Sequence, residues 1–257
     1  MTQGLIRIRV ARIDQVSAEI KRFELVSAEG EALPPFSAGS HVMITMREGG
    51  RVWRNPYSIM GATADKRGYV ISVHCTPGSR GGSAYMHSRV RVGSEIEISR
   101  PKNLFSVAVG ARKHIMIAGG VGITPMVAML DQFQKNGSDF ELHYAVRTPD
   151  AGAYFDDLAS ADDSGIHVYR SDFGERIALP DILSNQPPGT HLYVCGPQRM
   201  IDWAIEGAKD EGWPQENVHW ERSSAPPPGK SINEEKAEDR NIAICVSRAD
   251  GCVTLDL

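Results

Sequence analysis

The chain has 257 residues, of which 41% are hydrophobic and 23% are charged. These ordinary globular values exclude collagen-like, low-complexity and disulfide-scaffold classes, and the length predicts two compact units rather than one. A formal net charge of −4 offers no electrostatic footprint for nucleic acid or anionic lipid. The partners expected from this balance are small molecules and proteins.

Cysteine usage and hydropathy favour a reducing, aqueous compartment. The cysteines are scattered, and none of their spacings matches a zinc site or a small secreted disulfide framework; they are Cys75, Cys195, Cys245 and Cys252. The N-terminus lacks the apolar core of a signal peptide, and no later stretch is long enough for a membrane-spanning helix. We therefore predict a soluble, cytoplasmic protein.

The first part of the chain has the period-two pattern of β-strands. Between Leu5 and Ile98, apolar and polar side chains alternate in short runs, and Gly, Pro, Asn or Asp separates most of these runs. Short strands with few helical signals between them predict an antiparallel barrel or sandwich. We interpret residues 1–110 as a six-stranded antiparallel barrel.

After Lys113 the apolar runs become nearly continuous and alternate with segments of helical character. This pattern predicts a parallel sheet that is covered by helices on both faces. Residues 111–222 are therefore expected to form a doubly wound α/β unit. The predicted fold class is thus a β-barrel followed by an α/β domain.

The first helix of the α/β unit has the clearest signals. Thr124 and Pro125 are expected to be its N-cap and first helical position, and Gly137 its end. Its apolar stripe consists of Met126, Met129, Leu130 and Phe133. A later helix is expected to begin at Pro197 and to bury Met200, Ile201, Ala204 and Ile205.

The composition changes again near residue 223. Residues 223–240 contain three consecutive prolines and then many charges, which is typical of a linker. Residues 241–257 have the pattern of two short strands around a turn, and a two-stranded hairpin is marginal alone in water. We therefore expect residues 241–257 to begin a third domain that continues past Leu257.

The strongest local signal for chemistry lies in the predicted barrel. Arg54, Asn55, Tyr57 and Ser58 end one strand, and the turn Arg80, Gly81, Gly82 and Ser83 precedes a helical segment. An arginine fork and the backbone N–H groups of a glycine-rich turn both bind phosphate, while a tyrosine ring and a serine hydroxyl suit an aromatic ring. Either motif alone is equally consistent with an ordinary strand end or turn. Together they favour a phosphorylated aromatic cofactor.

The second signal lies between the first parallel strand and the first helix. Gly119, Gly120, Gly122, Thr124 and Pro125 would allow a tight turn, and the helix N-terminus attracts a pyrophosphate. The spacing is not G-x-G-x-x-G, and the alternative is a tight connection without a ligand. A matching signal is Cys195, Gly196 and Pro197, which close a later strand at the same carboxyl edge and leave room for a flat ring. By itself, a cysteine such as Cys195 is more often a small buried hydrophobe than a functional residue.

These four motifs occur in this order over nearly all of residues 1–222. In this combination the chain resembles the ferredoxin-reductase superfamily and, within it, the phthalate dioxygenase reductase group. The resemblance implies a flavin barrel, a nicotinamide domain and a plant-type [2Fe-2S] domain. Members of the group are NADH-dependent reductases that pass electrons one at a time to a Rieske-type oxygenase, so a terminal oxygenase is the expected protein partner. No self-association surface is identified, and a monomer is the default expectation.

The resemblance implies roles for particular residues. Arg54 would pair with the flavin phosphate or ribityl chain, with Asn55 beside it. Tyr57 would pack on the isoalloxazine ring, and Ser58 would lie near its N5 atom. The turn from Arg80 to Ser83 would cap a single phosphate, which favours FMN over FAD.

On the nucleotide side, Gly119 to Pro125 would hold the pyrophosphate, and the segment from Cys195 to Pro197 would line the nicotinamide pocket. Ser58 and Cys195 are the predicted catalytic residues. No metal ligand is predicted, and no protein acid or base is assigned to the hydride step, because proximity and ring stacking govern it. Further cofactor-binding residues are expected at His74, Arg147, Asp172 and Glu221.

The chain departs from the family pattern in two places. Where the family has an aromatic residue shortly after a glutamate, this chain has Ser223, with Trp220 as an alternative cover for the flavin. The C-x4-C-x2-C cluster of a plant-type ferredoxin is absent from residues 1–257, and Cys245 and Cys252 are interpreted as structural. The missing iron ligands are expected beyond Leu257.

The nucleotide and the acceptor are the least specified features. Asp172 would suit a ribose hydroxyl or an ordinary turn, whereas Arg170 and Arg176 would suit a 2'-phosphate; the resemblance favours NADH. Two alternatives to an oxygenase reductase remain. One is a flavin reductase, or a reductase for another acceptor, without an iron-sulfur centre, and the other is a non-catalytic module that binds flavin or nucleotide. The substrate of the oxygenase is not specified by this sequence.

Overall fold

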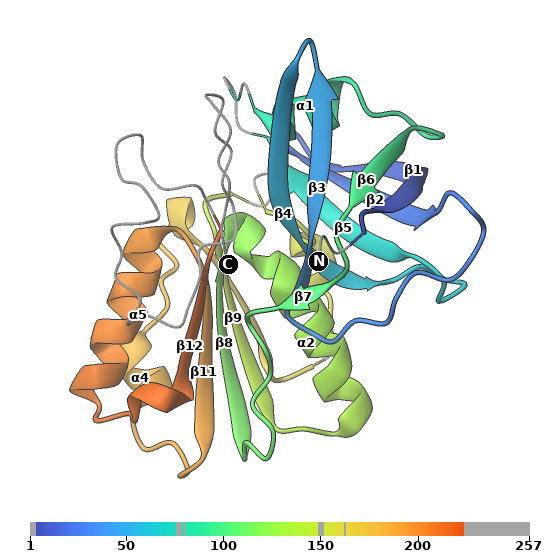
Figure 1. Ribbon diagram of the computed structural model, residues 1–257. Coiled ribbons are helices and arrows are strands. Elements are labelled where there is room, and N and C mark those ends of the chain that lie inside the picture. The colour runs from blue at the N-terminus through green and yellow to red at the C-terminus, as the bar shows by residue number, and fades with distance from the viewer. Residues whose placement is uncertain (1–3, 76–78, 80, 149–151, 162, 224–257) are drawn as a thin grey trace.

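The computed structural model describes residues 4–75, 79, 81–148, 152–161 and 163–223 (Figure 1). These residues form a seven-stranded sheet and a five-stranded sheet. Figure 1 shows the first sheet rolled up above one end of the second, with a helix between them. The predicted site residue Arg80 and nearly all of the predicted linker and third domain lie outside the described residues.

The first sheet closes into an antiparallel barrel. Its order is β4-β5-β2-β1-β6-β3, and β3 pairs again with β4 to complete the closure. The two-residue β7 (Lys102–Asn103) extends β3, and α1 (Gly82–Ser88) lies between β5 and β6. The prediction of a six-stranded antiparallel barrel is confirmed. The strands are β1 (Ile6–Ser17), β2 (Ile20–Ser27), β3 (Ser40–Glu48), β4 (Arg51–Ala62), β5 (Tyr69–His74) and β6 (Glu95–Ile98).

The barrel strands bury alternate side chains, as the period of a pleated strand requires. In β5, Tyr69, Ile71 and Val73 belong to the barrel core. The side chain between the last two, Ser72, is also buried, at 4% exposure. It therefore faces outward from the barrel and is covered by another part of the molecule.

The second sheet is parallel throughout, in the order β10-β9-β8-β11-β12. The predicted doubly wound unit is confirmed, and β12 is a fifth strand that the sequence patterns did not identify. The strands are β8 (Lys113–Gly119), β9 (Phe140–Val146), β10 (Ile166–Arg170), β11 (Thr190–Gly196) and β12 (Val218–Arg222). The helices are α2 (Ile123–Asn136), α3 (Phe155–Ala159), α4 (Leu179–Leu183) and α5 (Gln198–Asp210), with 3-10 turns η1 (Gly120–Gly122), η3 (Ser171–Phe173) and η4 (Gln215–Asn217).

Helix α2 begins earlier than predicted. Its N-cap is Gly122, not Thr124, because the glycine-rich η1 turn leads directly into the helix. The Thr124 hydroxyl instead donates to the Val121 carbonyl over 3.0 Å. The end is as predicted, since Gly137 takes the left-handed conformation with φ of 65°. Similarly, α5 has Pro197 as its N-cap and starts one residue later than expected.

Helix α2 joins the two sheets. It packs against β4 of the barrel, and its buried side chains form one apolar cluster with Ile20, Ala38 and Phe105 of the barrel segment. The Phe105 ring also contacts Tyr193 of β11 edge-on, with 6.0 Å between ring centroids. The barrel therefore rests on the parallel-sheet unit through a continuous hydrophobic contact.

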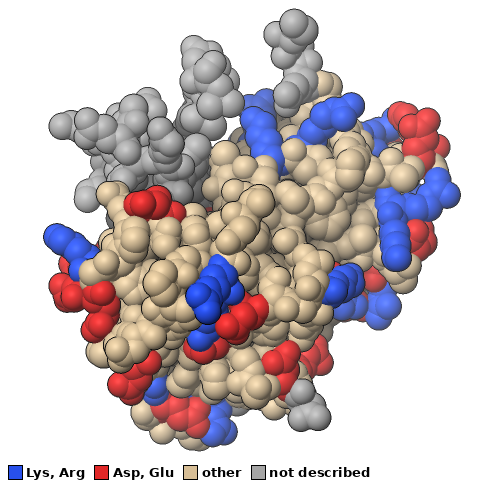
Figure 2. All heavy atoms as spheres, turned by 90° about the horizontal axis from the view of Figure 1, so that it is seen from below, with Lys and Arg blue, Asp and Glu red and all other residues tan. Residues whose placement is uncertain are grey.

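The surface shows no segregation of charge on the face seen in Figure 2, where Lys and Arg of the described residues are interspersed with Asp and Glu. Within the described part of the chain, no helix is both long enough and apolar enough to span a membrane.

Candidate functional site

Strand β4 carries the first group of predicted site residues, and its pleat sends them in two directions. Asn55 and Tyr57 face the barrel interior, where Asn55 Nδ2 donates to the Tyr57 hydroxyl over 3.2 Å. The Tyr57 ring belongs to the barrel core and is only 6% exposed. Arg54, which is exposed, and Ser58, which is buried, alternate with these inward residues. The stacking of Tyr57 on a flavin ring stays a prediction.

The glycine turn before α1 lies against the same strand. Ser83 Oγ is 3.4 Å from the Tyr57 hydroxyl. A Cβ atom at Gly82 would collide with the Met46 side chain and lie 2.8 Å from Asn55 Nδ2. Glycine therefore lets the turn approach β4 this closely without displacing these two side chains. Residues 82 and 83 lie against the interior side of β4, at Asn55 and Tyr57, whereas Arg54 faces the other way. The prediction that Arg54 to Ser58 end a strand is wrong, because β4 continues to Ala62. A phosphate site shared by Arg54 and this turn stays a prediction.

A buried carboxyl group connects the barrel to the parallel sheet. Ser58 Oγ donates to Glu221 Oε1 of β12 over 3.4 Å. Glu221 is 3% exposed, and its Oε2 atom has no hydrogen-bond partner among the described residues. Burial raises the pKa of Glu221 to about 8, because desolvation disfavours the charged form. At neutral pH the group is a carboxylic acid that can still form hydrogen bonds.

The second predicted catalytic residue lies beside this carboxyl group. Cys195 is 1% exposed near the end of β11 and is the register partner of Glu221 across the β11–β12 pair. Ser58, Cys195 and Glu221 thus converge from three strands of two different sheets. No spacing along the sequence specifies this convergence, because 163 positions separate Ser58 from Glu221.

Close packing explains the glycines at the carboxyl edge. A Cβ atom at Gly122 would collide with the Cys195 carbonyl oxygen and lie 2.9 Å from the Gly196 nitrogen. A Cβ atom at either Gly119 or Gly196 would come within 2.8 Å of Met200 Sδ. The two predicted nucleotide motifs are therefore in contact with each other. Pyrophosphate binding by this turn stays a prediction.

Two further predicted residues meet at the ends of β9 and β10. The Asp172 backbone N–H donates to the Arg147 carbonyl oxygen over 3.1 Å. The neighbouring Arg170 is held by Glu175, which accepts hydrogen bonds from both the Arg170 backbone and its guanidinium group. Arg176 donates to the carbonyl oxygens of residues 171 and 175. Asp172 itself is exposed at this edge.

His74 has a different environment. It ends β5, and its Nε2 atom lies 3.0 Å from Glu19 Oε2 within the barrel. The structure therefore gives His74 a local hydrogen-bond partner, and its role in cofactor binding stays a prediction.

The expectation that Trp220 covers the flavin is wrong. Trp220 packs in the cluster that includes Val194 and the helices α4 and α5, whereas Cys195 belongs to the cluster on the α2 side of the sheet. The strand alternation of β12 explains this, since neighbouring residues point to opposite faces. Sequence reasoning missed this because it did not identify β12 as a strand.

Sequence reasoning also missed Tyr154. This residue lies just before α3 with a positive φ of 61°, and its hydroxyl reaches Ser72 of the barrel over 2.7 Å. A tyrosine in a loop has no pattern that predicts such a contact.

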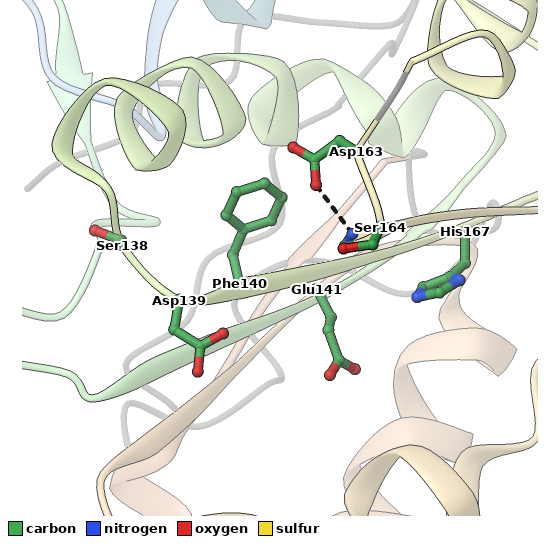
Figure 3. Close-up of a pocket in the computed structure, with 8 residues that line it drawn as sticks. Ser138, Asp139, Phe140, Glu141, Asp163, Ser164 and His167 are labelled. Atoms are coloured by element: carbon green, nitrogen blue, oxygen red, sulfur yellow. Dashed lines mark hydrogen bonds between the residues drawn. The ribbon is translucent and has the colours of Figure 1, made fainter.

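A pocket of about 340 Å³ lies away from this site. Figure 3 shows it at the start of β9 and in the loop before β10, which is the amino edge of the parallel sheet. Three of its eight lining residues are acidic, and Asp163 Oδ1 there accepts the Gly165 backbone N–H over 2.9 Å. The pocket is lined by Ser138, Asp139, Phe140, Glu141, Asp163, Ser164, Gly165 and His167, none of which is a predicted site residue.

Comparisons with known proteins identify the family. Residues 96–218 match the model for the N-terminal domain of dimethylamine monooxygenase subunit DmmA-like proteins. A carnitine monooxygenase reductase subunit from Acinetobacter baumannii is 39% identical over 225 residues, which cover 87% of this chain and 70% of that protein. The β subunit of a heme-dependent oxidative N-demethylase from Ectopseudomonas mendocina is 40% identical over 233 residues, covering 91% and 74% of the two chains.

A solved structure agrees with these relatives. Phthalate dioxygenase reductase, described as a modular structure for electron transfer from pyridine nucleotides to [2Fe-2S], superposes with a TM-score of 0.79. It is 31% identical to this chain, and the match covers 86% of this chain and 69% of that structure. This chain belongs to the family of oxidoreductases that are the reductase components of oxygenases and that includes phthalate dioxygenase reductase.

Proposed function

We propose that this chain transfers electrons from NADH through FMN toward an oxygenase. In this proposal, residues 1–110 bind the flavin, residues 111–222 bind the nucleotide, and residues 223–240 and 241–257 are a linker and the start of a ferredoxin-like domain. The observation that carries the proposal is the contact between Ser58 and Glu221, at 3.4 Å. It joins the predicted flavin side of the barrel to the predicted nicotinamide side of the parallel sheet.

The residues in the middle of β4 fit a flavin. The Gly81–Ser83 turn is held against β4, so that its backbone can approach a phosphate, and the Glu221 Oε2 atom is a buried polar group beside Ser58 that none of the described residues satisfies. Arg54 and the turn would hold the phosphate, and Ser58 would contact the ring edge. A bound flavin supplies the chemistry that accepts a hydride and releases electrons singly. The proposal of FMN over FAD rests on the single-phosphate turn of the family.

The buried carboxyl group has a defined role in this arrangement. Because the pKa of Glu221 is about 8, the group remains uncharged at neutral pH. It accepts a hydrogen bond from the Ser58 hydroxyl, and its register partner on the neighbouring strand is Cys195. These three side chains orient the site and exclude water from it, since each is at most 8% exposed. The hydride step depends on this alignment rather than on an acid or a base.

The contacts at the ends of β9 and β10 support NADH over NADPH. Arg170 would be a candidate partner for a 2'-phosphate, but Glu175 pairs with its guanidinium group and offsets its charge. Asp172 is exposed next to Arg147, where a carboxylate suits a ribose diol and repels a phosphate.

The residues of this chain do not fit a [2Fe-2S] cluster. None of the spacings among the four cysteines in residues 1–257 is that of a plant-type ferredoxin. In the described part, Cys195 is buried in the parallel sheet, and no group of three or more His, Cys, Asp or Glu residues could hold a metal ion. We therefore derive no electron-transfer step through residues 1–257 beyond the flavin.

The proposed protein partner is an oxygenase component. The family resemblance favours a Rieske-type oxygenase. A heme-dependent oxygenase is the second candidate, because the heme-dependent N-demethylase β subunit matches 91% of this chain at 40% identity.

An anaerobic absorption spectrum before and after stoichiometric NADH tests the proposal. We expect flavin bands that bleach with NADH and much more slowly with NADPH, and FMN as the flavin released by denaturation. Equal or faster bleaching by NADPH would contradict the nucleotide assignment. Flavin that neither nucleotide reduces would overturn the reductase function and favour the binding module.

A further inference from the structure

Tyr154 holds an unusual backbone conformation. Its φ of 61° and ψ of 21° place it in the left-handed region, where non-glycine residues are uncommon and bulky ones are strained. It is the N-cap of α3, but its side chain does not cap the helix. Such strain persists only when surrounding contacts hold it, and it marks positions where the side-chain direction matters.

The strained backbone directs the Tyr154 side chain out of its own unit and onto the barrel. Its hydroxyl lies 2.7 Å from Ser72 Oγ on β5 and 3.6 Å from Met60 Sδ on β4. Ser72 and Met60 are 4% and 5% exposed, so the barrel side of the contact is buried, while Tyr154 is partly buried. Both partners face outward from the barrel, because they alternate with core residues of their strands.

The segment that carries Tyr154 is also fixed from the parallel sheet. The Tyr144 hydroxyl of β9 donates to the Ala153 carbonyl oxygen over 3.0 Å. Gly152 lies so close that a Cβ atom there would come within 2.7 Å of a Val146 methyl group. Residues 152–154 therefore connect the carboxyl end of β9 directly to β4 and β5 of the barrel. Arg147 is the residue that follows β9.

The barrel and the parallel-sheet unit also meet through the apolar packing of α2, which is non-directional. The Tyr154 contact adds a directional constraint at a second place besides Ser58 and Glu221. Such a constraint matters because hydride transfer is sensitive to misplacement of donor and acceptor by about 1 Å.

We propose that Tyr154 is a positioning residue for hydride transfer. Its hydrogen bond fixes segment 152–154, on the nucleotide side, to strands β4 and β5 and so sets the distance and orientation between nicotinamide and flavin. This inference rests on the proposed function. Tyr154 contacts neither the nucleotide nor the flavin in this proposal, and it acts through the relative placement of the two units.

The test compares Tyr154→Phe with Ser72→Ala, the double variant and a control. Each single variant removes one side of the hydrogen bond and keeps the backbone. The control is Tyr169→Phe, which loses a hydrogen bond to His143 Nδ1 at 3.0 Å inside the parallel-sheet unit. The full chain is reduced anaerobically by NADH in a stopped-flow instrument, and photoreduction of the bound flavin without nucleotide is measured in parallel.

We expect the limiting rate of flavin reduction by NADH to fall about fivefold in Tyr154→Phe, with a weaker NADH–flavin charge-transfer band and a nearly unchanged half-saturating NADH concentration. Ser72→Ala should show a similar loss, and the double variant no more than either single one. Photoreduction, flavin content and the Tyr169→Phe control should match the wild type.

The positioning role would be overturned if Tyr154→Phe reduced its flavin with NADH at the wild-type rate, or if the losses in the double variant were additive. It would also be overturned if photoreduction in Tyr154→Phe slowed as much as reduction by NADH. Flavin loss in Tyr154→Phe alone would likewise overturn it, because the residue would then serve barrel stability. A wild-type protein whose flavin NADH does not reduce is a separate result, and it would overturn the proposed function itself.

Discussion

Strand β4 of the barrel presents alternate side chains to the parallel-sheet unit, whereas β8 and β11 are buried along nearly their whole length and reach the site only at their carboxyl ends. The outward face of a barrel strand can carry functional side chains in its middle, such as Ser58 and Met60. A parallel strand that is covered on both faces can place polar chemistry only at its end. The site therefore combines a strand face with a sheet edge.

The largest effect is expected where a glycine contacts rigid backbone. Gly122→Ala should lower the free energy of unfolding by about 2 kcal/mol or more, because its Cβ would collide with the Cys195 carbonyl group at the sheet edge. Gly82→Ala in the barrel should cost about 1 kcal/mol, because the Met46 and Asn55 side chains can move.

Urea unfolding of both variants measures this difference. Gly61→Ala is the matched control, because a Cβ atom added at Gly61 would have no described atom within 4 Å outside its own stretch of chain. A larger loss in Gly82→Ala than in Gly122→Ala would contradict the distinction between a rigid sheet edge and an adaptable strand face.

Glu221 should make stability depend on pH. Its folded pKa of about 8 lies above the ordinary value of 4.5, so the folded state binds the proton more tightly than the unfolded state. The stabilising contribution of Glu221 should therefore be lost as the pH rises from about 4.5 to about 8. Buried histidines such as His41, His114 and His143, whose pKa values burial lowers to about 4, act in the opposite direction below about pH 6.5 and do so in both proteins. The free energy of unfolding of the wild type relative to that of Glu221→Gln should therefore fall as the pH rises.

Urea unfolding at several pH values measures the slope in both proteins. Glu211→Gln, at the exposed end of α5, is a control that should keep the wild-type slope. An unchanged slope in Glu221→Gln would show that the carboxyl group is ionised or solvated in the folded protein.

Arg54 should matter for flavin retention and little for folding. Removing a charge-assisted hydrogen bond costs about 1.5 kcal/mol, so Arg54→Ala should weaken FMN binding about tenfold. Arg51→Ala is the matched control, because Arg51 is an exposed arginine on the same strand. Flavin content after dialysis measures the effect, and equal retention by both variants would remove Arg54 from the phosphate site.

The smallest effect is expected at the Arg170–Glu175 pair, because it is partly exposed and solvent weakens it. Glu175→Gln should raise the ratio of kcat/KM for NADPH to that for NADH about two- to fivefold. Steady-state rates with both nucleotides measure this ratio. Asp131→Asn, which breaks an exposed pair with Lys135, should leave it unchanged. A fall in the ratio would contradict the proposed role of Glu175.

Local signals predict much of the secondary structure. Helix α2 ends at Gly137, because the left-handed conformation there favours glycine. A single residue type is therefore enough to predict this helix end. The prediction of Thr124 as the N-cap is wrong, because the Gly120–Gly122 turn is followed directly by the helix, whose N-cap is Gly122, two residues earlier. The prediction for Trp220 is wrong because its face depends on β12, whose pairing with β11 is a long-range contact.

The sequence by itself determined the two fold classes, because the change from alternating to continuous hydrophobic patterns reflects how many faces of each strand are buried. It also determined the glycine-rich turns, because close backbone approach admits only glycine. The tertiary structure alone decided that Ser58, Cys195 and Glu221 converge and that Tyr154 reaches Ser72. These contacts join distant segments through the packing of the two units, and no local periodicity encodes how the two units are placed relative to each other.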